Sequence, residues 1–458
     1  MSKKVGIVIC NYNKQMYIVK CIESVLKSSF HDFDIYVVDN ASTDDSVKKI
    51  REHFGTQVIL LENKENLGGS GGFNTGLREA LKREYEYLML VDNDIVMDPH
   101  AIEELYCFLE KHAQVGLVGA EIYQMDHPEE IMALGAVVDY EKYCYEDCYR
   151  GYADSDDIPE VNYCDYVPAC TLMVRRSVVD EVGILDEGNF IYWDDIEWAK
   201  RIQVAGHQVA AIRAAKIWHK GGGGSPTNTF PIYYYIRNAI RFFAKYIPED
   251  KMDSCVDGLL ADIFQRIYGS FLKGKNNYVA TIVRAYEDAL QGISGKAKEG
   301  IILPLVDNRN NFLKYLAGKN NILVQLTDTC SEEKFGKLKK FVAFLEKKCV
   351  DKSFTFSTEK CAIYHEGIKE QLNKEYHNKF CVVIQADVND YDLVLRFCKH
   401  VREITALEEN IVFVDCYTNA VGTEDELLFF KSYQTNLEFF QFCNHEYFKT
   451  GMLELKKI

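Results

Sequence analysis

The chain has 458 residues and a mass of 52.7 kDa, which is too long for one compact domain and suits two or three. Hydrophobic residues make up 47% of the chain and charged residues 27%, values that exclude wholesale disorder. The 69 Asp and Glu residues outnumber the 53 Lys and Arg residues, so the net charge of -16 is a poor match to a nucleic-acid backbone. We therefore expect no nucleic-acid partner.

The N-terminal segment MSKKVGIVIC is apolar too briefly for a signal peptide, and no stretch approaches the ~20 apolar residues of a membrane-spanning helix. The 15 cysteines are scattered along the chain without the dense spacing of a disulfide scaffold. These features predict a cytoplasmic protein whose cysteines are free thiols.

From Val5 to about His219 the sequence alternates short apolar runs with amphipathic stretches. The apolar runs predict strands at Val5–Cys10, Asp34–Asp39, Gln57–Leu61 and Tyr87–Val91. The stretches between the strands predict helices at Met16–Lys27, Thr43–Glu52 and Gly72–Arg83. This alternation predicts an α/β domain with a parallel sheet covered on both faces, whose ligands gather beyond the carboxyl ends of the strands.

Polar residues follow each of the four predicted strands. They read Asn11-Tyr12-Asn13, Asp39-Asn40, Glu62-Asn63 and Asp92-Asn93-Asp94. Because the carboxyl ends of parallel strands meet at one edge of a sheet, we expect these segments to form a single site.

The glycines at 221–224 and Pro226 interrupt this pattern, and a helical region follows to about Gly300. Within it, Tyr233–Ile247 predicts an amphipathic helix with basic residues every four positions on one face. Packing of its apolar face on the preceding domain is favoured, and contact with a membrane surface is the alternative. Strand-like runs then return, separated by helical segments such as Glu332–Lys347, which predicts a second, smaller α/β domain. The strand-like runs are Ile322–Leu326, Phe380–Gln385 and Ile411–Val414.

Asp92 and Asp94 stand at the end of the most apolar of the early strands. Two carboxylates at positions i and i+2 there can both reach one divalent cation or one ribose. Oxygen ligands of this kind suit Mg²⁺ or Mn²⁺. A solvated turn is the usual reading of an isolated D-x-D, but its place at a strand end favours a ligand site.

The run from Asn66 to Gly72, NLGGSGG, precedes a helix that we expect to begin near Phe73. Glycine lets a ligand approach the backbone closely, and a helix N-terminus favours an anion. The run is not G-x-G-x-x-G, and G-x-x-x-x-G-K-[ST] is absent from the chain, which disfavours a dinucleotide-dependent dehydrogenase. Taken alone, the run could equally be a flexible turn.

Asp194 and Asp195 lie in a segment, Ile191–Trp198, that opens a predicted helix running to about Gly206. Two adjacent carboxylates cannot both cap a helix, so one of them is free for other work. Trp193 beside them suits stacking on a sugar face, with an ordinary core position as the alternative. His219 follows an apolar run and precedes four glycines, and it is a candidate ligand for Mn²⁺ or Zn²⁺.

Four cysteines, Cys144, Cys148, Cys164 and Cys170, raise the question of zinc. Their spacings, C-x3-C and C-x5-C, miss the usual C-x2-C pairs, so a zinc site is disfavoured and left open.

The order of these segments resembles the family 2 glycosyltransferases of the GT-A fold over roughly the first half of the chain. The segments that carry the resemblance are CNYN, VVDNASTDDS, NLGGSGGFNTG, VDND, YVPACTLMVRRSVVDEVGILDE, YWDDIEWAKRIQVAGH and IWH. Within that family, NLGGSGGF, WDD, IWH and YYYIRN are most similar to bacterial galactofuranosyltransferases, and rhamnosyltransferases share much of the pattern. The resemblance implies a GT-A domain, with a Rossmann-like and mostly parallel sheet, over residues 1–230. A helical region over 231–305 and an α/β domain of unassigned role over 306–458 follow.

Site residues carry over from the resemblance position by position. Asp39 matches the aspartate that contacts the nucleotide base, and Asp92 the one that faces the ribose and the metal. Asp94 and His219 match metal ligands, and Asp195 matches the catalytic base. The other expected contacts to the nucleotide-sugar are Asn11, Asn66, Gly68, Gly69, Trp193, Asp194 and Arg237.

The implied activity is Mn²⁺- or Mg²⁺-dependent inverting transfer from a nucleotide-diphospho-sugar to a glycan or lipid-linked acceptor, in surface-polysaccharide assembly. UDP-galactofuranose is the expected donor and dTDP-rhamnose the alternative. A sugar nucleotidyltransferase would show a Gly-rich, Arg-containing loop after the first strand, where this chain has Asn11-Tyr12-Asn13-Lys14. A catalytically silent scaffold, a homo-oligomer and a location at the inner face of the membrane stay open.

Overall fold

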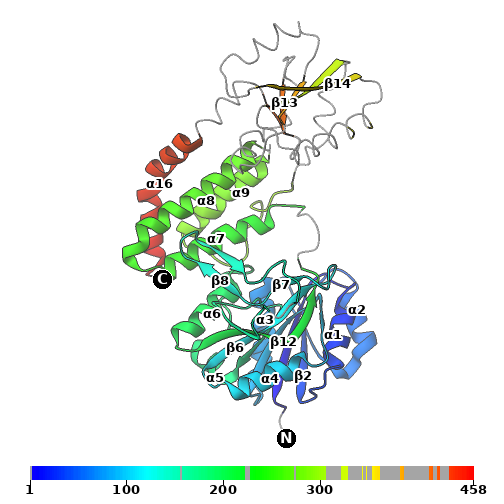
Figure 1. Ribbon diagram of the computed structural model, residues 1–458. Coiled ribbons are helices and arrows are strands. Elements are labelled where there is room, and N and C mark those ends of the chain that lie inside the picture. The colour runs from blue at the N-terminus through cyan, green and yellow to red at the C-terminus, as the bar shows by residue number, and fades with distance from the viewer. Residues whose placement is uncertain are drawn as a thin grey trace.

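The computed structural model describes residues 3–154, 157–221, 227–272, 275–305 and 433–457, together with short elements between 321 and 422. A sheet flanked by helices forms the N-terminal part of the molecule. The helices α7 (Phe230–Tyr246), α8 (Met252–Leu272), α9 (Asn276–Leu290) and α16 (Tyr433–Leu455) stack against one another beside it (Figure 1).

The main sheet has ten strands in the order β10-β12-β6-β11-β4-β1-β2-β3, with β5 paired to β12 and β7 paired to β6. Strands β4, β1, β2 and β3 run parallel, as do β12 and β6, whereas β11 is antiparallel to both of its neighbours. The bounds are β1 (Val5–Asn11), β2 (Phe33–Asp39), β3 (Ile59–Glu62), β4 (Tyr87–Asp92), β5 (Ile95–Met97), β6 (Val115–Gln124), β7 (Ile131–Ala133), β10 (Val161–Tyr163), β11 (Thr171–Arg175) and β12 (Gln208–His219).

Both faces of the sheet are covered by helices, as the alternation of the sequence predicted. Along β4, Leu88 and Leu90 point into one hydrophobic core while Met89 and Val91 point into the other, because successive side chains of a strand face opposite ways. The first core lies under α3 (Gly68–Ala80), α5 (Arg176–Val182) and α6 (Asp194–Val204). The second lies under α1 (Ile18–Leu26), α2 (Ser46–Phe54) and α4 (Ala101–Lys111). The predicted α/β class is confirmed.

Helix α3 begins at Gly68, so the expectation that it begins near Phe73 was wrong. The glycines form its first turns because close packing outweighs their poor helix propensity. A Cβ at Gly72 would overlap Cys10 Sγ, which shows how tightly the start of α3 lies on β1. The Gly-rich run therefore allows α3 to pack closely on the sheet, and it is not a loose loop.

Most of helix α7 is buried. Its apolar residues Ile236, Ile240 and Phe243 are at most 3% exposed, and Arg237 on the basic face is fully buried. Lys245 pairs with Glu197 at 2.8 Å. The packing interpretation of the apolar face is confirmed, and on the basic face Arg237 is buried while the side chain of Lys245 is 53% exposed.

A two-stranded hairpin, β8 (Ala136–Asp139) and β9 (Cys144–Asp147), lies outside the main sheet. Beyond residue 306 the described strands pair β13 (Asn321–Thr327) with β14 (Ser353–Cys361), and β16 (Val412–Asp415) with β15 (Val382–Gln385) and β17 (Ala420–Gly422). The helix predicted over Glu332–Lys347 lies almost entirely outside the described residues. No helix in the described ranges combines the length and apolar character needed to cross a membrane.

Candidate functional site

The carboxyl ends of β1, β2 and β4 lie side by side, because Asn11 is the register partner of Asp39 and Cys10 that of Asp92. Asn11 joins these ends. Its Nδ2 donates to Asp39 Oδ1 at 3.0 Å, and its Oδ1 accepts from Asn93 Nδ2 at 3.0 Å. The polar strand ends are therefore one hydrogen-bonded layer, as expected of a single site.

Asn11 and Asp39 form the floor of this site and do not line its cavity. Asn11 is fully buried and Asp39 is 3% exposed. The second oxygen of Asp39 accepts a hydrogen bond from the backbone N–H of Ser42 at 2.9 Å. We expected these two residues to contact the nucleotide directly. In the structure they instead support the loops that follow β1 and β2.

A cavity of about 660 Å³ opens beyond these strand ends. Its walls come from four regions: the loops after β1 and β2, the start of α3, the end of β4, and the segments before α6 and at the start of α7. The lining residues are Cys10, Tyr12, Asn40, Asn66, Gly68, Gly69, Phe73, Asp92, Asn93, Phe190, Ile191, Thr227, Asn228, Phe230 and Pro231. The sequence-predicted residues Asn66, Gly68, Gly69 and Asp92 are among them.

Asn40 organises the cavity wall, although the sequence suggested no separate role for it. Its Nδ2 donates to Asn66 Oδ1 at 3.1 Å and to the Gly68 carbonyl at 2.8 Å. Its Oδ1 accepts from the backbone of Leu67 at 3.1 Å and from Asn63 Nδ2 at 3.0 Å. One buried amide thereby fixes the chain that leads into α3. The only sequence signal was its place directly after a strand-ending aspartate.

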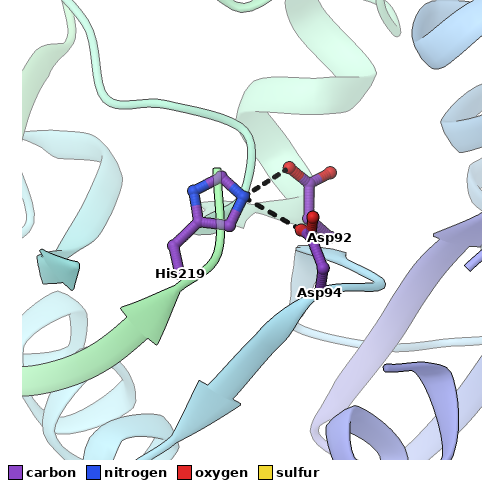
Figure 2. Close-up of side chains that lie close together, drawn as sticks. All are labelled: Asp92, Asp94 and His219. Carbon is purple, nitrogen blue, oxygen red and sulfur yellow. Dashed lines mark hydrogen bonds and ion pairs between the residues drawn. The ribbon is translucent and has the colours of Figure 1, made fainter. Parts of the chain in front are cut away.

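Asp92, Asp94 and His219 come together at the edge of this cavity (Figure 2). The end of β12 pairs with β5, which follows directly on the Asp92–Asp94 turn, and this brings His219 to the two carboxylates. His219 Nε2 lies 3.0 Å from Asp94 Oδ1 and 3.6 Å from Asp92 Oδ2. Lys14 Nζ contacts the other oxygen of Asp94 at 2.7 Å.

The electrostatics of this cluster favour positive charge. Burial lowers the pKa of His219, but contacts with Cys170, Asp94 and Asp92 outweigh it and raise the pKa to about 11. Hydrogen bonds from His219 and Lys14 lower the pKa of Asp94 despite its burial. Burial raises the pKa of Asp92 to about 6, with Asp94 and Asp194 adding to the effect. The ammonium of Lys14 and the imidazole of His219 thus lie against the carboxylates where a metal ion is expected, and His219 would bind that ion as the neutral imidazole.

The donor set fits a divalent cation, since two carboxylates and one imidazole are ligands that Mn²⁺ and Mg²⁺ accept, the imidazole suiting Mn²⁺ better. In the described ranges the other group with three potential ligands is Asp139, Cys144 and Glu146. Among the described residues, the four cysteines considered for zinc do not form a common ligand group. All four are free thiols, and only Cys144 joins a cluster.

Asp194 and Asp195 begin α6, with Trp193 at the cap position, so neither carboxylate is the N-cap. Asp194 is buried and its Oδ2 accepts from Ser70 Oγ at 2.9 Å. Asp195 accepts hydrogen bonds from the backbone N–H groups of Ala169 at 3.2 Å and Ile196 at 2.9 Å. Burial and the neighbouring Asp194 raise the pKa of Asp195 to about 7, and Asp92 contributes. A carboxyl group with this pKa is suited to accept a proton near neutral pH.

Trp193 does not face the cavity, so the expectation of sugar stacking was wrong. It is 1% exposed, and its ring packs against the rings of Tyr145, Phe242 and Phe243 at 5.2–5.6 Å between centroids. It belongs to the core between α6 and α7, and the core alternative holds for Trp198 as well, which is fully buried.

Arg237 does not reach toward a diphosphate, which corrects its assignment as a nucleotide-sugar contact. It is fully buried, and its guanidinium donates to backbone carbonyls of Gly188, Asn189 and Gly295. Its neighbour Asn238, which the sequence did not single out, lies on the same backbone segment. Spacing alone cannot distinguish an arginine for phosphate from one for carbonyl oxygens.

Two tyrosines, Tyr145 of β9 and Tyr166, lie near Asp195, and Tyr235 packs against Tyr145. The ring centroid of Tyr145 lies 5.7 Å from that of Tyr166 and 6.1 Å from that of Tyr235. Burial raises the pKa values of Tyr145 and Tyr166, and the charge of Asp195 adds to both shifts. These phenol groups are therefore neutral hydrogen-bonding groups next to the acid pair.

Replacing Gly68 with alanine is expected to destabilise the protein, because Gly68 has a φ of +77° and a Cβ there would overlap the carbonyl of Phe190. The left-handed conformation alone costs a residue with a side chain roughly 1–2 kcal/mol. Gly69→Ala is the matched control, since its Cβ would lie 3.6 Å from Asp194 Oδ2, an ordinary contact. Thermal melting should show the larger loss for Gly68→Ala; equal melting temperatures contradict a required close approach.

Comparison with known proteins bears on this site. Residues 6–182 match the family model described as Glycosyl transferase family 2. The galactofuranosyltransferase GlfT2 of Mycolicibacterium smegmatis is 25% identical over 251 residues, covering 51% of this chain and 38% of that protein. GlfT2 of Mycobacterium tuberculosis is 24% identical over 222 residues, covering 43% of this chain and 34% of that protein. The chain thus spans little more than a third of these relatives.

Among solved structures, GalNAc-T7 with UDP, GalNAc and Mn²⁺ is 14% identical, with a TM-score of 0.45 over 56% of this chain and 50% of that one. Among relatives found by sequence, the glycosyltransferase GlyG of Streptococcus pneumoniae is 34% identical over 109 residues, covering 23% of this chain and 35% of that protein. The family match spans the strands β1 to β11 that carry the polar strand ends and the Asp92–Asp94 turn. Residues 6–182 of this chain, a little over a third of its length, are therefore similar to glycosyl transferase family 2.

Proposed function

We propose that this chain is a metal-dependent, inverting glycosyltransferase that moves a sugar from a nucleotide-diphospho-sugar to a hydroxyl group of a glycan or lipid-linked glycan. One observation carries the proposal. Asp92 belongs to a cation site with Asp94 and His219 and also lines the cavity, and residues 6–182, which contain Asp92 and Asp94, match the family 2 model. The charges of Asp92 and Asp194 raise the pKa values of Asp195 and Asp92, respectively, which is consistent with one shared site.

Asp92, Asp94 and His219 would hold the metal, which when bound would offset the negative charge on the departing nucleotide diphosphate. Asp195 accepts the proton of the acceptor hydroxyl. The acceptor oxygen bonds to the anomeric carbon as the bond from that carbon to the diphosphate breaks. One base and a direct displacement leave the anomeric configuration inverted, with no covalent intermediate.

The cavity suits the donor in size, since pockets for ligands of this class commonly measure ~300–1,000 Å³ and this one measures about 660 Å³. Tyr12 at its mouth is 42% exposed and is free to stack on a nucleotide base. With Trp193 in the core, the sugar would instead meet Phe190, Ile191 and the backbone of Gly69.

On the proposed acceptor side, Tyr145 and Tyr166 lie near Asp195, with Tyr235 packed against Tyr145. Neutral phenol groups can donate to and accept from sugar hydroxyls. These contacts support a hydroxyl-rich acceptor. Surface-polysaccharide assembly at the inner face of the membrane is the setting that we propose.

UDP-galactofuranose is the proposed donor, supported by the likeness to two proteins named galactofuranosyltransferase and by the NLGGSGGF and WDD segments. The test is a competition assay with UDP-galactofuranose, UDP-galactopyranose, UDP-glucose and dTDP-rhamnose at equal concentration, with Mn²⁺ or with a chelator. Discrimination by shape is often worth ~1–3 kcal/mol, so a preference of about 10- to 200-fold is expected.

Each outcome of this assay has a distinct meaning. Preferential transfer of rhamnose, or equal use of both ring forms of UDP-galactose, removes the galactofuranose assignment and leaves the glycosyltransferase. Full activity in the chelator removes the metal dependence. No transfer from any donor, with UDP still bound, supports a catalytically silent protein.

A further inference from the structure

The backbone before the acid pair is held in an unfavourable conformation. Phe190, Tyr192 and Trp193 have φ values of 65°, 60° and 65°, in the left-handed region that residues with bulky side chains rarely adopt. Trp193 directly precedes Asp194, so the direction in which α6 begins depends on this turn. Such conformations persist only where surrounding contacts impose them.

The contacts that impose it come from two adjacent side chains of α7. Asn238 Nδ2 lies within hydrogen-bond distance of the carbonyl oxygens of Asn189 (2.8 Å), Ile191 (2.8 Å) and Tyr192 (2.9 Å). Arg237 Nη2 lies 3.2 Å from the Gly188 carbonyl and 3.1 Å from that of Asn189. Both side chains are fully buried.

Arg237 and Asn238 act as one unit. Arg237 Nε donates to Asn238 Oδ1 at 3.0 Å, which orients the amide so that its Nδ2 faces the turn. Arg237 Nη1 donates to the Gly295 carbonyl at 2.7 Å, and the guanidinium lies over the rings of Tyr233 and Tyr234. Among the described residues no carboxylate pairs with it. Because this buried charge binds neutral carbonyl oxygens, its role is to hold the geometry of that backbone.

The same turn contacts the donor cavity. The Phe190 carbonyl accepts a hydrogen bond from the backbone N–H of Ser70 at 3.3 Å, and Ser70 Oγ donates to Asp194 at 2.9 Å. The start of α3, the turn and the acid pair are therefore connected, and α7 holds the turn from behind.

We propose that Arg237 and Asn238 are positioning residues that hold residues 188–193 so that Asp195 faces the acceptor hydroxyl. The inference rests on the proposed function, since it takes Asp195 as the base. The two side chains themselves line neither the donor cavity nor the cation site, so we expect their main effect on the rate of transfer and a smaller one on nucleotide binding.

The test compares Asn238→Ala and Arg237→Lys with Arg241→Lys. Arg241 lies one turn further along the same face of α7 and pairs with Asp186, so it controls for loss of a half-buried guanidinium. A lysine at 237 cannot span Gly188 and Gly295 together, yet it keeps the charge and most of the volume. Melting temperature verifies that each variant is folded.

We expect kcat to fall about 10- to 100-fold in Asn238→Ala and Arg237→Lys. The Kd for UDP in the presence of Mn²⁺ should stay within threefold of the unaltered chain, and the acid limb of the pH profile should move as Asp195 loses its surroundings. Amide exchange of residues 189–196 should accelerate in both variants and not in Arg241→Lys.

Amide exchange distinguishes failure of the positioning role from failure of the proposed function. Faster exchange in the two variants, in a protein that transfers no sugar from any donor, supports the positioning of the turn and removes the assignment of Asp195 as base. Unchanged exchange and a kcat within twofold of the unaltered chain overturn the positioning role. If Asn238→Ala does not fold, Arg237→Lys decides by the same two measurements.

Discussion

Asp195→Asn is expected to lower the rate of sugar transfer about 10²–10⁴-fold, the usual cost of losing a general base, while the Kd for UDP and Mn²⁺ stays nearly unchanged. The amide keeps the size of the side chain but cannot accept the acceptor proton. Asp195 touches the backbone of Ala169 and Ile196 and is not one of the three metal-site residues, so the donor site should survive.

Asp180→Asn is the matched control, because Asp180 is an exposed carboxylate that pairs with Arg176 outside the site. Rates are best measured in single-turnover transfer, with UDP affinity determined by calorimetry. Turnover by Asp195→Asn at the rate of the unaltered chain would remove this residue from the mechanism and leave it a backbone-capping group of α6.

The pH dependence follows from the same residue. The base acts when deprotonated, and burial together with Asp194 raises its pKa to about 7. Transfer should therefore rise with pH, about tenfold per unit below this value, and level off above it. The rising limb should be missing from the residual activity of Asp195→Asn.

Loss of a metal-site residue is expected to have the second large effect. His219→Ala and Asp94→Asn should each weaken Mn²⁺ binding by more than ~10–100-fold. That range is the typical loss when the substituted residue does not bind the metal itself but only hydrogen-bonds to a side chain that does. His219 Nε2 lies 3.0 Å from Asp94, so each substitution removes one donor of the same cluster. Titration of Mn²⁺ against the protein with UDP bound measures the effect without any turnover.

Lys14→Met supplies a control of opposite sign. Its ammonium lies 2.7 Å from Asp94, where it competes with a cation for that carboxylate. Its removal should leave the Mn²⁺ affinity unchanged or stronger. An unaltered Mn²⁺ affinity in His219→Ala would show that the imidazole is a structural partner of Asp94 and not a metal ligand.

The early part of the fold could be predicted because its signals are local. Apolar runs of four to seven residues with polar ends marked β1, β2, β3 and β4 to within two residues at each end. The two-residue period of a strand then fixed which side chains face each core. The ends of β1, β2 and β4 meet at one edge because parallel strands end together, and Asp92 stands there for this reason.

Other expectations failed where neighbours distant in sequence decide the outcome. Trp193 and Arg237 have residue types suited to a sugar and a diphosphate, but the packing of α7 against the turn before α6 buries both. The start of α3 at Gly68 depends on Asn40 and on close contact with β1, neither of which glycine content reveals. Burial is a property of the whole arrangement, so a residue type alone does not report it.

The sequence by itself determined the α/β class, the polar strand ends and the identity of the carboxylates and histidine of the site. Only the tertiary structure decided that β12 pairs with β5 and so brings His219 within 3.0 Å of Asp94, across 125 positions of the chain. It also decided that Arg237 and Asn238 of α7 hold backbone carbonyls. Local patterns record backbone preference and hydrophobic period, whereas the distance between remote side chains is set by how the elements pack.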